Sequence, residues 1–201
     1  MANDQRVLTG CRPIMQPYGN IRVNAYQVTT GAIFYLNQPL TLDSNGRAAV
    51  MTSAANVVFL GVAVGFLDKN KASLPSDITT LSAAPYFPAA GEGNSYVLVT
   101  DDPNQLYIME EGTGGTDFTQ ADIGQTVTFD ELTKGSTTTG LSSIVIEQSI
   151  LASSTQGTFQ LVAIADRVNS DGTPNTAGDG CKWIVRPTRH QLGNMAVSVP
   201  V

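Results

Sequence analysis

The stretch that decides the fold is GAIFYLNQPLTLDSNGRAAVMTSAANVVFLGVAVGF, residues 31–66. Short apolar runs alternate in it with turn-forming or small residues, which is the pattern of consecutive β-strands. The strands that it predicts cover residues 33–36, 39–42, 47–51 and 57–65.

Two features of this stretch carry specific predictions. Asp43-Ser44-Asn45-Gly46 predicts a tight hairpin turn, because Asn and Gly tolerate the positive φ angles that such turns require. The run VVFLGVAV at 57–64 is almost wholly apolar and favours a strand that is buried on both faces. Nothing in the stretch has the pattern of a chemical site, so we expect it to form the frame of a β-unit, with residues 57–64 at the centre of its core.

The rest of the chain repeats short predicted strands with Gly, Pro, Asn and Asp between them. No amphipathic helical pattern spans three turns, and this combination is typical of β-sandwiches and β-barrels. A chain of 201 residues is long enough for one large or two small domains. We predict an all-β protein of two small β-sandwich or β-barrel units, with an extended N-terminal arm and long loops.

Composition shifts along the chain suggest three parts. An N-terminal arm and first strand cover 1–30, a β-rich N-terminal domain with a Pro-rich link covers 31–90, and a β-rich C-terminal domain covers 91–201. In the last part, residues 96–100 and 105–110 flank the turn signal DDPN and predict a hairpin. The arm contains prolines, which disfavour helix. Its candidate partner-contact residues are Arg12, Pro13, Met15, Pro17 and Tyr18.

The charge content narrows the range of partners. Charged residues make up 14% of the chain, below the roughly 25% usual for soluble domains. Two explanations stay open: a surface that other protein covers, or a solvated β-surface rich in Ser and Thr. The net charge is −6 and the pI about 4.6, and Lys and Arg are scattered singly. Binding a phosphate backbone needs several cations together, so we expect no nucleic-acid partner and no anionic membrane partner.

The two cysteines, Cys11 and Cys181, lie near opposite ends of the chain. They allow one long-range disulfide, but a pair of unbonded, apolar cysteines is favoured. The N-terminus lacks the charged region and apolar run of a signal peptide, and no apolar stretch approaches about 18 residues. These features favour a soluble chain that folds inside a cell.

Few residues suit catalysis or metal binding. His190 is the only histidine, which excludes a two-histidine metal site and disfavours zinc. A Ser-His-Asp triad would need His190, and no G-x-S-x-G motif is present. We expect His190 to be a surface or interface residue.

The acidic loop DRVNSDGTPNTAGD, residues 166–179, offers oxygen ligands for calcium. If Gly172 is aligned as the glycine of a calcium loop, however, Arg167 and Gly178 occupy ligand positions, so a plain β-connection is favoured. The Gly-rich segments 91–93 and 112–115 do not lie between a strand and a helix and are not phosphate loops. The sequence predicts no catalytic residue, no metal and no cofactor, and the protein is not expected to be an enzyme.

The chain resembles a family of tailed-bacteriophage virion proteins, the head decoration or capsid cement proteins. The resemblance spans about residues 31–191 and consists of strand and turn patterns. The segments that carry it are PLTLDSNGR (39–47), FLGVAVG (59–65), VLVTDDPNQLYI (97–108), FQLVAIADR (159–167) and CKWIVR (181–186), with Arg189-His190-Gln191 after the last.

This resemblance implies a structural protein that is made in the host cytoplasm and becomes part of the virion at the capsid surface. Its implied partners are the major capsid protein and further copies of itself, as a trimer or dimer. It would bridge adjacent capsid subunits against the internal pressure of packaged DNA. The arm residues named above would then reach a neighbouring subunit, and deletion of residues 1–18 is expected to weaken binding while leaving the β-fold intact.

Other functions stay open. One is a different phage virion module, such as a tail or fibre component, or a carbohydrate-binding β-domain. A sugar site needs an exposed aromatic residue, and Trp183 is the strongest candidate, although its strand has the pattern of a core strand. A hydrolase with an unrecognised site is disfavoured by the single histidine.

Overall fold

The computed structural model describes residues 9–14, 21–29, 31–53, 57–67, 70, 95–112, 116–130, 135–151, 157–168 and 172–193. In this part of the chain the elements are strands, apart from one 3-10 turn, η1 (Gln120–Asp122), and they form two antiparallel sheets. The predicted all-β fold is confirmed. The predicted link between the two units lies almost wholly outside the described residues.

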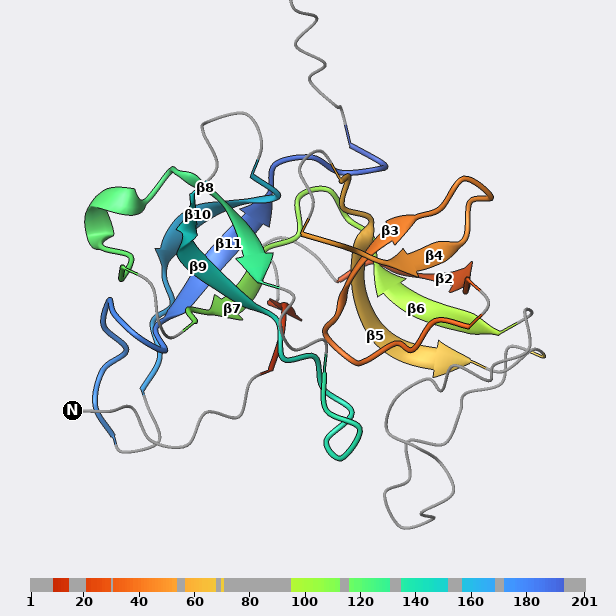
Figure 1. Cartoon of the computed structure of the whole chain (residues 1–201), viewed down its shortest axis with the longest axis horizontal. Coiled ribbons are helices and arrows are strands. Elements are labelled where there is room, and N and C mark those ends of the chain that lie inside the picture. Colours follow the sequence, from red (N-terminus) through yellow and green to blue (C-terminus); the bar gives the residue numbers. More distant parts are fainter. Residues whose placement is uncertain are drawn as a thin grey trace, which may run out of the picture.

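The two sheets lie side by side (Figure 1). The six-stranded sheet has the order β1 (Arg12–Pro13), β7 (Tyr107–Glu110), β11 (Lys182–Pro187), β10 (Phe159–Ile164), β8 (Thr126–Asp130) and β9 (Val145–Leu151). The five-stranded sheet has the order β2 (Val23–Gln27), β6 (Tyr96–Thr100), β5 (Gly61–Leu67), β3 (Pro39–Leu42) and β4 (Ala48–Val50).

Both sheets curl so that strands distant in the sheet order meet. In the five-stranded sheet, Val28 forms a parallel bridge with Ala48, and the amide of Thr29 donates to the Ala48 carbonyl at 3.0 Å. In the six-stranded sheet, Glu111 and Ile146 form a similar bridge. Each sheet therefore wraps around its own apolar interior, as a half-closed barrel does.

The chain passes between the sheets more often than the sequence suggests. β6 pairs with β2 and β5, whereas β7 pairs with β1 and β11. The predicted hairpin of 96–100 with 105–110 is therefore wrong, and residues 101–106 form a crossover from one sheet to the other. β1 precedes residue 30 and lies in the six-stranded sheet, whereas β6 follows residue 91 and lies in the five-stranded one.

Within residues 31–66, most predictions hold. β3 has the predicted bounds, and the turn after it has Gly46 at φ +72° with the Asp43 carboxylate accepting the amides of Asn45 and Arg47. The segment 33–36 is not a strand, because its backbone bonds to several separate segments: Leu36, for example, bridges to Leu141.

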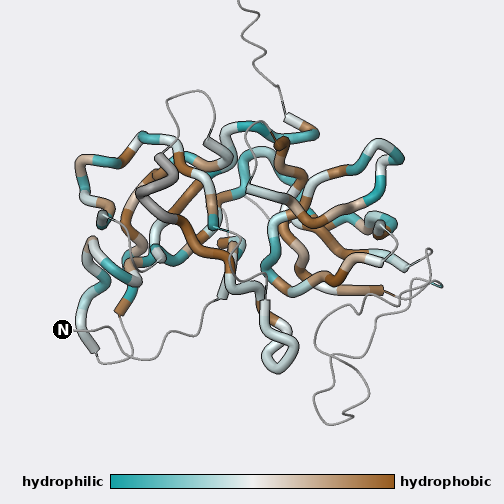
Figure 2. The backbone as a smooth tube through the Cα atoms, viewed as in Figure 1, coloured by the Kyte–Doolittle hydropathy of each residue, from teal (hydrophilic) through white to brown (hydrophobic). Residues whose placement is uncertain are grey.

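The run at 57–64 lies between two cores, each formed by one sheet. Phe59 and Val62 pack in the core of the six-stranded sheet, and Leu60 and Ala63 pack in the core of the five-stranded sheet. All four side chains are fully buried, which confirms that residues 59–63 are covered on both faces. The predicted strand 57–65 is only partly right, because β5 begins at Gly61 and runs to Leu67, and Val57, Val58 and Val64 are half-buried. Figure 2 shows the hydrophobic stretches concentrated in the strands of both units. Residues 59–63 therefore join the two cores.

Cys11 and Cys181 are unbonded, as predicted, and both are buried in the core of the six-stranded sheet. Burial raises the pKa of both thiols, that of Cys181 to about 12. Among the described residues, no helix is long and apolar enough to cross a membrane.

Candidate functional site

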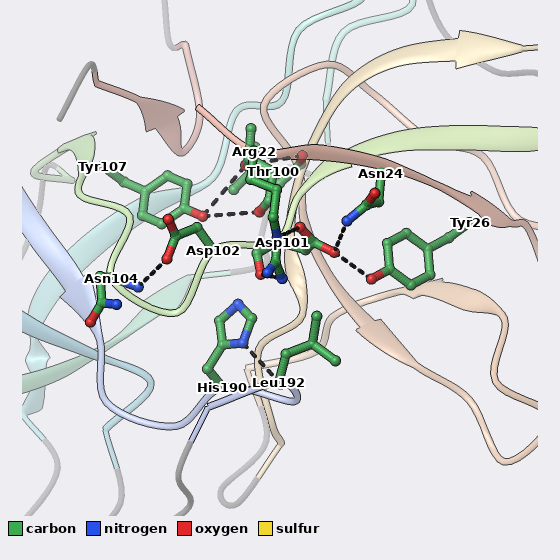
Figure 3. A network of polar contacts seen from close by, with 11 residues as sticks. Arg22, Asn24, Tyr26, Thr100, Asp101, Asp102, Asn104, Tyr107, His190 and Leu192 are labelled. Carbon is green, nitrogen blue, oxygen red and sulfur yellow. Dashed lines mark hydrogen bonds and ion pairs between the residues drawn. The ribbon is translucent and has the colours of Figure 1, made fainter. Parts of the chain in front are cut away.

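The main polar cluster lies where the two sheets meet and consists of Arg22, Asn24, Tyr26 and Asp101 (Figure 3). We refer to these four residues as the junction cluster. Alternate side chains of a strand share a face. Asn24 and Tyr26 of β2 therefore lie on the same face as Arg22, which directly precedes the strand. Val23 pairs with Thr100 of β6, so the next residue along, Asp101, lies opposite Arg22.

Asp101 accepts bonds from all three other residues of the cluster. Arg22 Nε donates to Oδ1 at 2.6 Å, and Asn24 Nδ2 and Tyr26 Oη donate to Oδ2 at 2.8 and 2.5 Å. The Asp101 side chain is fully buried, whereas that of Arg22 is 48% exposed. Both carboxylate oxygens are thus occupied by the protein itself.

The bonding sets the charge of the cluster. Burial alone would raise the pKa of Asp101, but the bonds from Arg22, Tyr26 and Asn24 outweigh it and hold the pKa below its usual value. Burial, together with the bond to Asp101, raises the pKa of Tyr26 to about 12. At neutral pH the cluster therefore consists of a carboxylate, a guanidinium and a neutral phenol, which is an arrangement that stabilises structure and has no free base.

His190 lies close to the junction cluster and is 5% exposed, so it is not a surface residue. Its segment bonds to residue 59 from both sides: the Phe59 amide donates to the Arg189 carbonyl, and the Gln191 amide donates to the Phe59 carbonyl. The two rings meet edge to face at 5.8 Å. The sequence did not reveal this contact because it joins residues 131 positions apart.

The His190 ring is held in a neutral state. Nδ1 accepts the amide of Leu192 at 3.1 Å. Burial lowers the pKa of His190, and Arg22 adds to this, while Asp101 acts in the opposite direction. Phe59 and His190 thus fasten the segment after β11 to the run that joins the two cores.

A second buried carboxylate, that of Glu111, also accepts hydrogen bonds from the protein through both of its oxygens. Its Oε1 accepts the amide of Phe118 at 2.6 Å and its Oε2 accepts Nε1 of Trp183 at 2.9 Å. Burial is the main cause that raises the pKa of Glu111. Trp183 is fully buried in the core, as its strand pattern predicted, and presents no face to a sugar.

The described residues contain no group of three or more His, Cys, Asp or Glu that could hold a metal ion. In the acidic loop, Val168 and Pro174 form an antiparallel bridge. The Asn175 side chain donates to the carbonyls of Ala165 and Lys182 and accepts the Lys182 amide. The side-chain amide of Asn175 therefore holds the loop together, which agrees with the interpretation of the loop as a plain β-connection.

The predicted arm is only partly described. Arg12 and Pro13 form β1, opposite Ile108 and Tyr107 of β7, with the Arg12 side chain exposed. Met15, Pro17 and Tyr18 lie outside the described residues. Because Cys11 is in the core and β1 is a strand of the sheet, deletion of residues 1–18 would remove part of the fold. The structure therefore favours a destabilised fold after this deletion over an intact one.

The junction cluster is not predicted from the sequence. The alternating polar residues at 22, 24 and 26 and the acidic pair at 101–102 were visible signals. Only the pairing of β2 with β6 brings them together.

Comparisons of the chain with protein-family models, with curated protein sequences and with solved structures gave no match. The resemblance to phage decoration proteins therefore stays a prediction from the sequence.

Proposed function

We propose that the protein is a structural component of a tailed-phage virion that binds the outer surface of the capsid and bridges major capsid protein subunits. The observation that carries the proposal is the use of the buried charged groups. The carboxylate oxygens of Asp101 and Glu111 accept hydrogen bonds from other residues of the protein. The thiols of Cys11 and Cys181 are buried, and burial raises their pKa values. Asp101 joins β2 to the crossover between the sheets, and Glu111 holds Phe118 and Trp183 within the six-stranded unit, so both carboxylates serve the fold.

An open strand edge supports a protein partner. The Val28 amide donates to Ser95 beside β6, and the Thr29 amide donates to Ala48 on the opposite side, so odd-numbered residues of β2 direct their backbone groups away from β6. Val28 and Thr29 meet Ala48 of β4 on this side, but Val23 and Ala25 are exposed, and within the described residues no strand pairs with the edge at these two positions. Such an edge accepts a strand from another chain.

The partners in this proposal are the major capsid protein and further copies of this chain, with no cofactor. The protein would be made in the host cytoplasm and would function at the capsid surface. Bridging two capsid subunits requires a body that transmits force without deforming, and the shared segment 59–63 together with the junction cluster supplies one.

The test is co-sedimentation of the purified protein with undecorated capsids. We expect the protein to pellet at a fixed ratio to the shell protein and to saturate. Absence of binding across ordinary salt concentrations would overturn the proposal and favour a tail or fibre component.

A further inference from the structure

A half-open groove of about 490 Å³ lies where the crossover between β6 and β7 passes the six-stranded sheet. Volumes of this size are typical of sites that hold a ligand or a few side chains. One wall comes from the sheet and the other from the crossover. The lining residues that matter are Thr126, Gln160 and Arg186 on the sheet side, and Pro103, Asn104 and Leu106 on the crossover side.

The three sheet residues form a row across adjacent strands. Gln160 of β10 lies directly opposite Thr126 of β8 on one side and Arg186 of β11 on the other. Directly opposed residues share a face of the sheet. The neighbours of Gln160 in β10, Phe159 and Leu161, are buried in the core, so the row faces away from the core and toward the groove.

The guanidinium of Arg186 is held in place by this row. Arg186 Nε donates to Gln160 Oε1 at 2.7 Å, and Gln160 Nε2 donates to the Gly124 carbonyl at 2.6 Å. Gln160 is therefore anchored at one end and orients the arginine with the other. The side chain of Arg186 is exposed, and no carboxylate of the described residues pairs with it. A guanidinium carries five N–H donors, so four remain for a ligand.

The chemistry of the groove favours a carboxylate. An oriented guanidinium matches a carboxylate with two parallel bonds. Pro103 and Leu106 offer apolar surface for the carbon atoms of the ligand, and Asn104 offers an amide. A nucleic-acid backbone would need several cations together, and Arg186 is the one cation among the residues that line this groove.

We propose that this groove binds a carboxylate-bearing segment of a partner protein, with Arg186 receiving an Asp or Glu side chain and Leu106 contacting its carbon chain. A carboxylate can bind at Arg186 whether or not the partner protein is a capsid subunit.

The test uses the full chain and small probes. Succinate and its uncharged counterpart succinamide are titrated at constant ionic strength while NMR follows the Arg186 Nε–H and the amides of Thr126 and Gln160. We expect saturable shifts with succinate in the millimolar range and none with succinamide. R186Q should weaken succinate binding about tenfold or more, and R186K, which keeps the charge but loses the fork, should weaken it several-fold.

R167Q is the matched control, because Arg167 is exposed and does not line the groove. It should bind succinate as the unchanged protein does, and thermal unfolding should show that all variants are folded. Equal binding by R186Q, equal binding of succinamide, or the absence of saturation would overturn the proposal. So would tighter binding of inorganic phosphate than of succinate.

Discussion

Arg22 binds Asp101 at two points, through Nε to the carboxylate at 2.6 Å and through Nη2 to the main-chain carbonyl at 2.7 Å, although 79 positions separate them in the sequence. The first bond neutralises a buried charge, and the second fixes the backbone where the chain leaves β6. The pair therefore ties the edge strand of one sheet to the crossover that leads into the other.

The first prediction concerns the carboxylate of this pair. D101N removes the charge that Arg22, Asn24 and Tyr26 all bind, and hydrogen bonds to charged groups contribute about 1.5–3 kcal/mol each. The guanidinium of Arg22 is partly exposed and can bind water instead, which limits the cost of losing its partner. We therefore expect a loss of about 2–4 kcal/mol in the free energy of unfolding, measured by urea denaturation at pH 7.

D102N is the control for this variant. Asp102 is the next residue and accepts one exposed bond, from the amide of Asn104 at 2.8 Å. Its loss should cost about 0.5 kcal/mol or less. Equal destabilisation by the two variants would show that the junction cluster is not the stabilising element.

The second prediction concerns pH. The pKa of His190 is lowered in the folded protein from its ordinary 6.5. The unfolded chain therefore binds more protons just below pH 6.5, so stability must fall as the pH drops from about 6.5 toward the lower folded pKa. H190N places an oxygen near the position of Nδ1 to accept the Leu192 amide, and it cannot titrate. We expect its free energy of unfolding to depend less on pH between about 5 and 7.

The measurement is the difference between the unfolding free energies of the unchanged protein and H190N at several pH values. A difference is needed because Glu111, whose pKa is raised, makes a contribution of opposite sign as the pH changes. The chain has one histidine, so no other imidazole contributes. Parallel pH curves for the two proteins would contradict the prediction.

Local sequence patterns predicted most individual strands and turns, but they did not predict which strands pair over long distances in the chain. β3, its turn and the buried run at 57–64 follow from spacing and residue type, which act over a few residues. The hairpin of β6 with β7 was wrong because the turn signal DDPN is equally compatible with a crossover. What decides between them is the pairing of β6 with β2, about 75 residues away, where the Tyr26 hydroxyl donates to the Asp101 carboxylate.

The candidate site shows the same division. The sequence indicated correctly that Trp183 belongs to the core and that the cysteines are unbonded. It could not indicate that His190 is buried, because the segment around His190 is polar and its main chain bonds to Phe59, which is distant in the sequence. The row formed by Thr126, Gln160 and Arg186 likewise exists only through the register of three strands.

The third prediction concerns the run between the two cores. A Cβ at Gly61 would lie 2.1 Å from the Thr100 carbonyl oxygen and 2.6 Å from Val99 Cγ1. The backbone atom cannot move without displacing β6, so G61A should destabilise the fold by about 3 kcal/mol or more in urea denaturation.

G65A is the matched control in the same strand. There the nearest atom to a new Cβ is Leu98 Cδ1 at 3.1 Å, the end of a flexible side chain. Alanine also restricts the unfolded chain, which offsets part of the cost, so we expect a change within about 1 kcal/mol. If G61A is as stable as G65A, β5 and β6 are not in close contact at this point.

The last prediction joins the fold to the proposed function. The Arg12 side chain is exposed on β1, while its backbone pairs with Ile108, so R12E changes the surface and keeps the strand. Its free energy of unfolding should stay within about 0.5 kcal/mol. If the N-terminal segment contacts the shell, reversal of this charge should weaken co-sedimentation with capsids about tenfold or more, because a mismatched charge in a contact costs several kcal/mol. R167E makes the same reversal at another exposed position and should bind capsids as the unchanged protein does. Undiminished binding by R12E, with R167E as the reference, would place the shell contact on another surface.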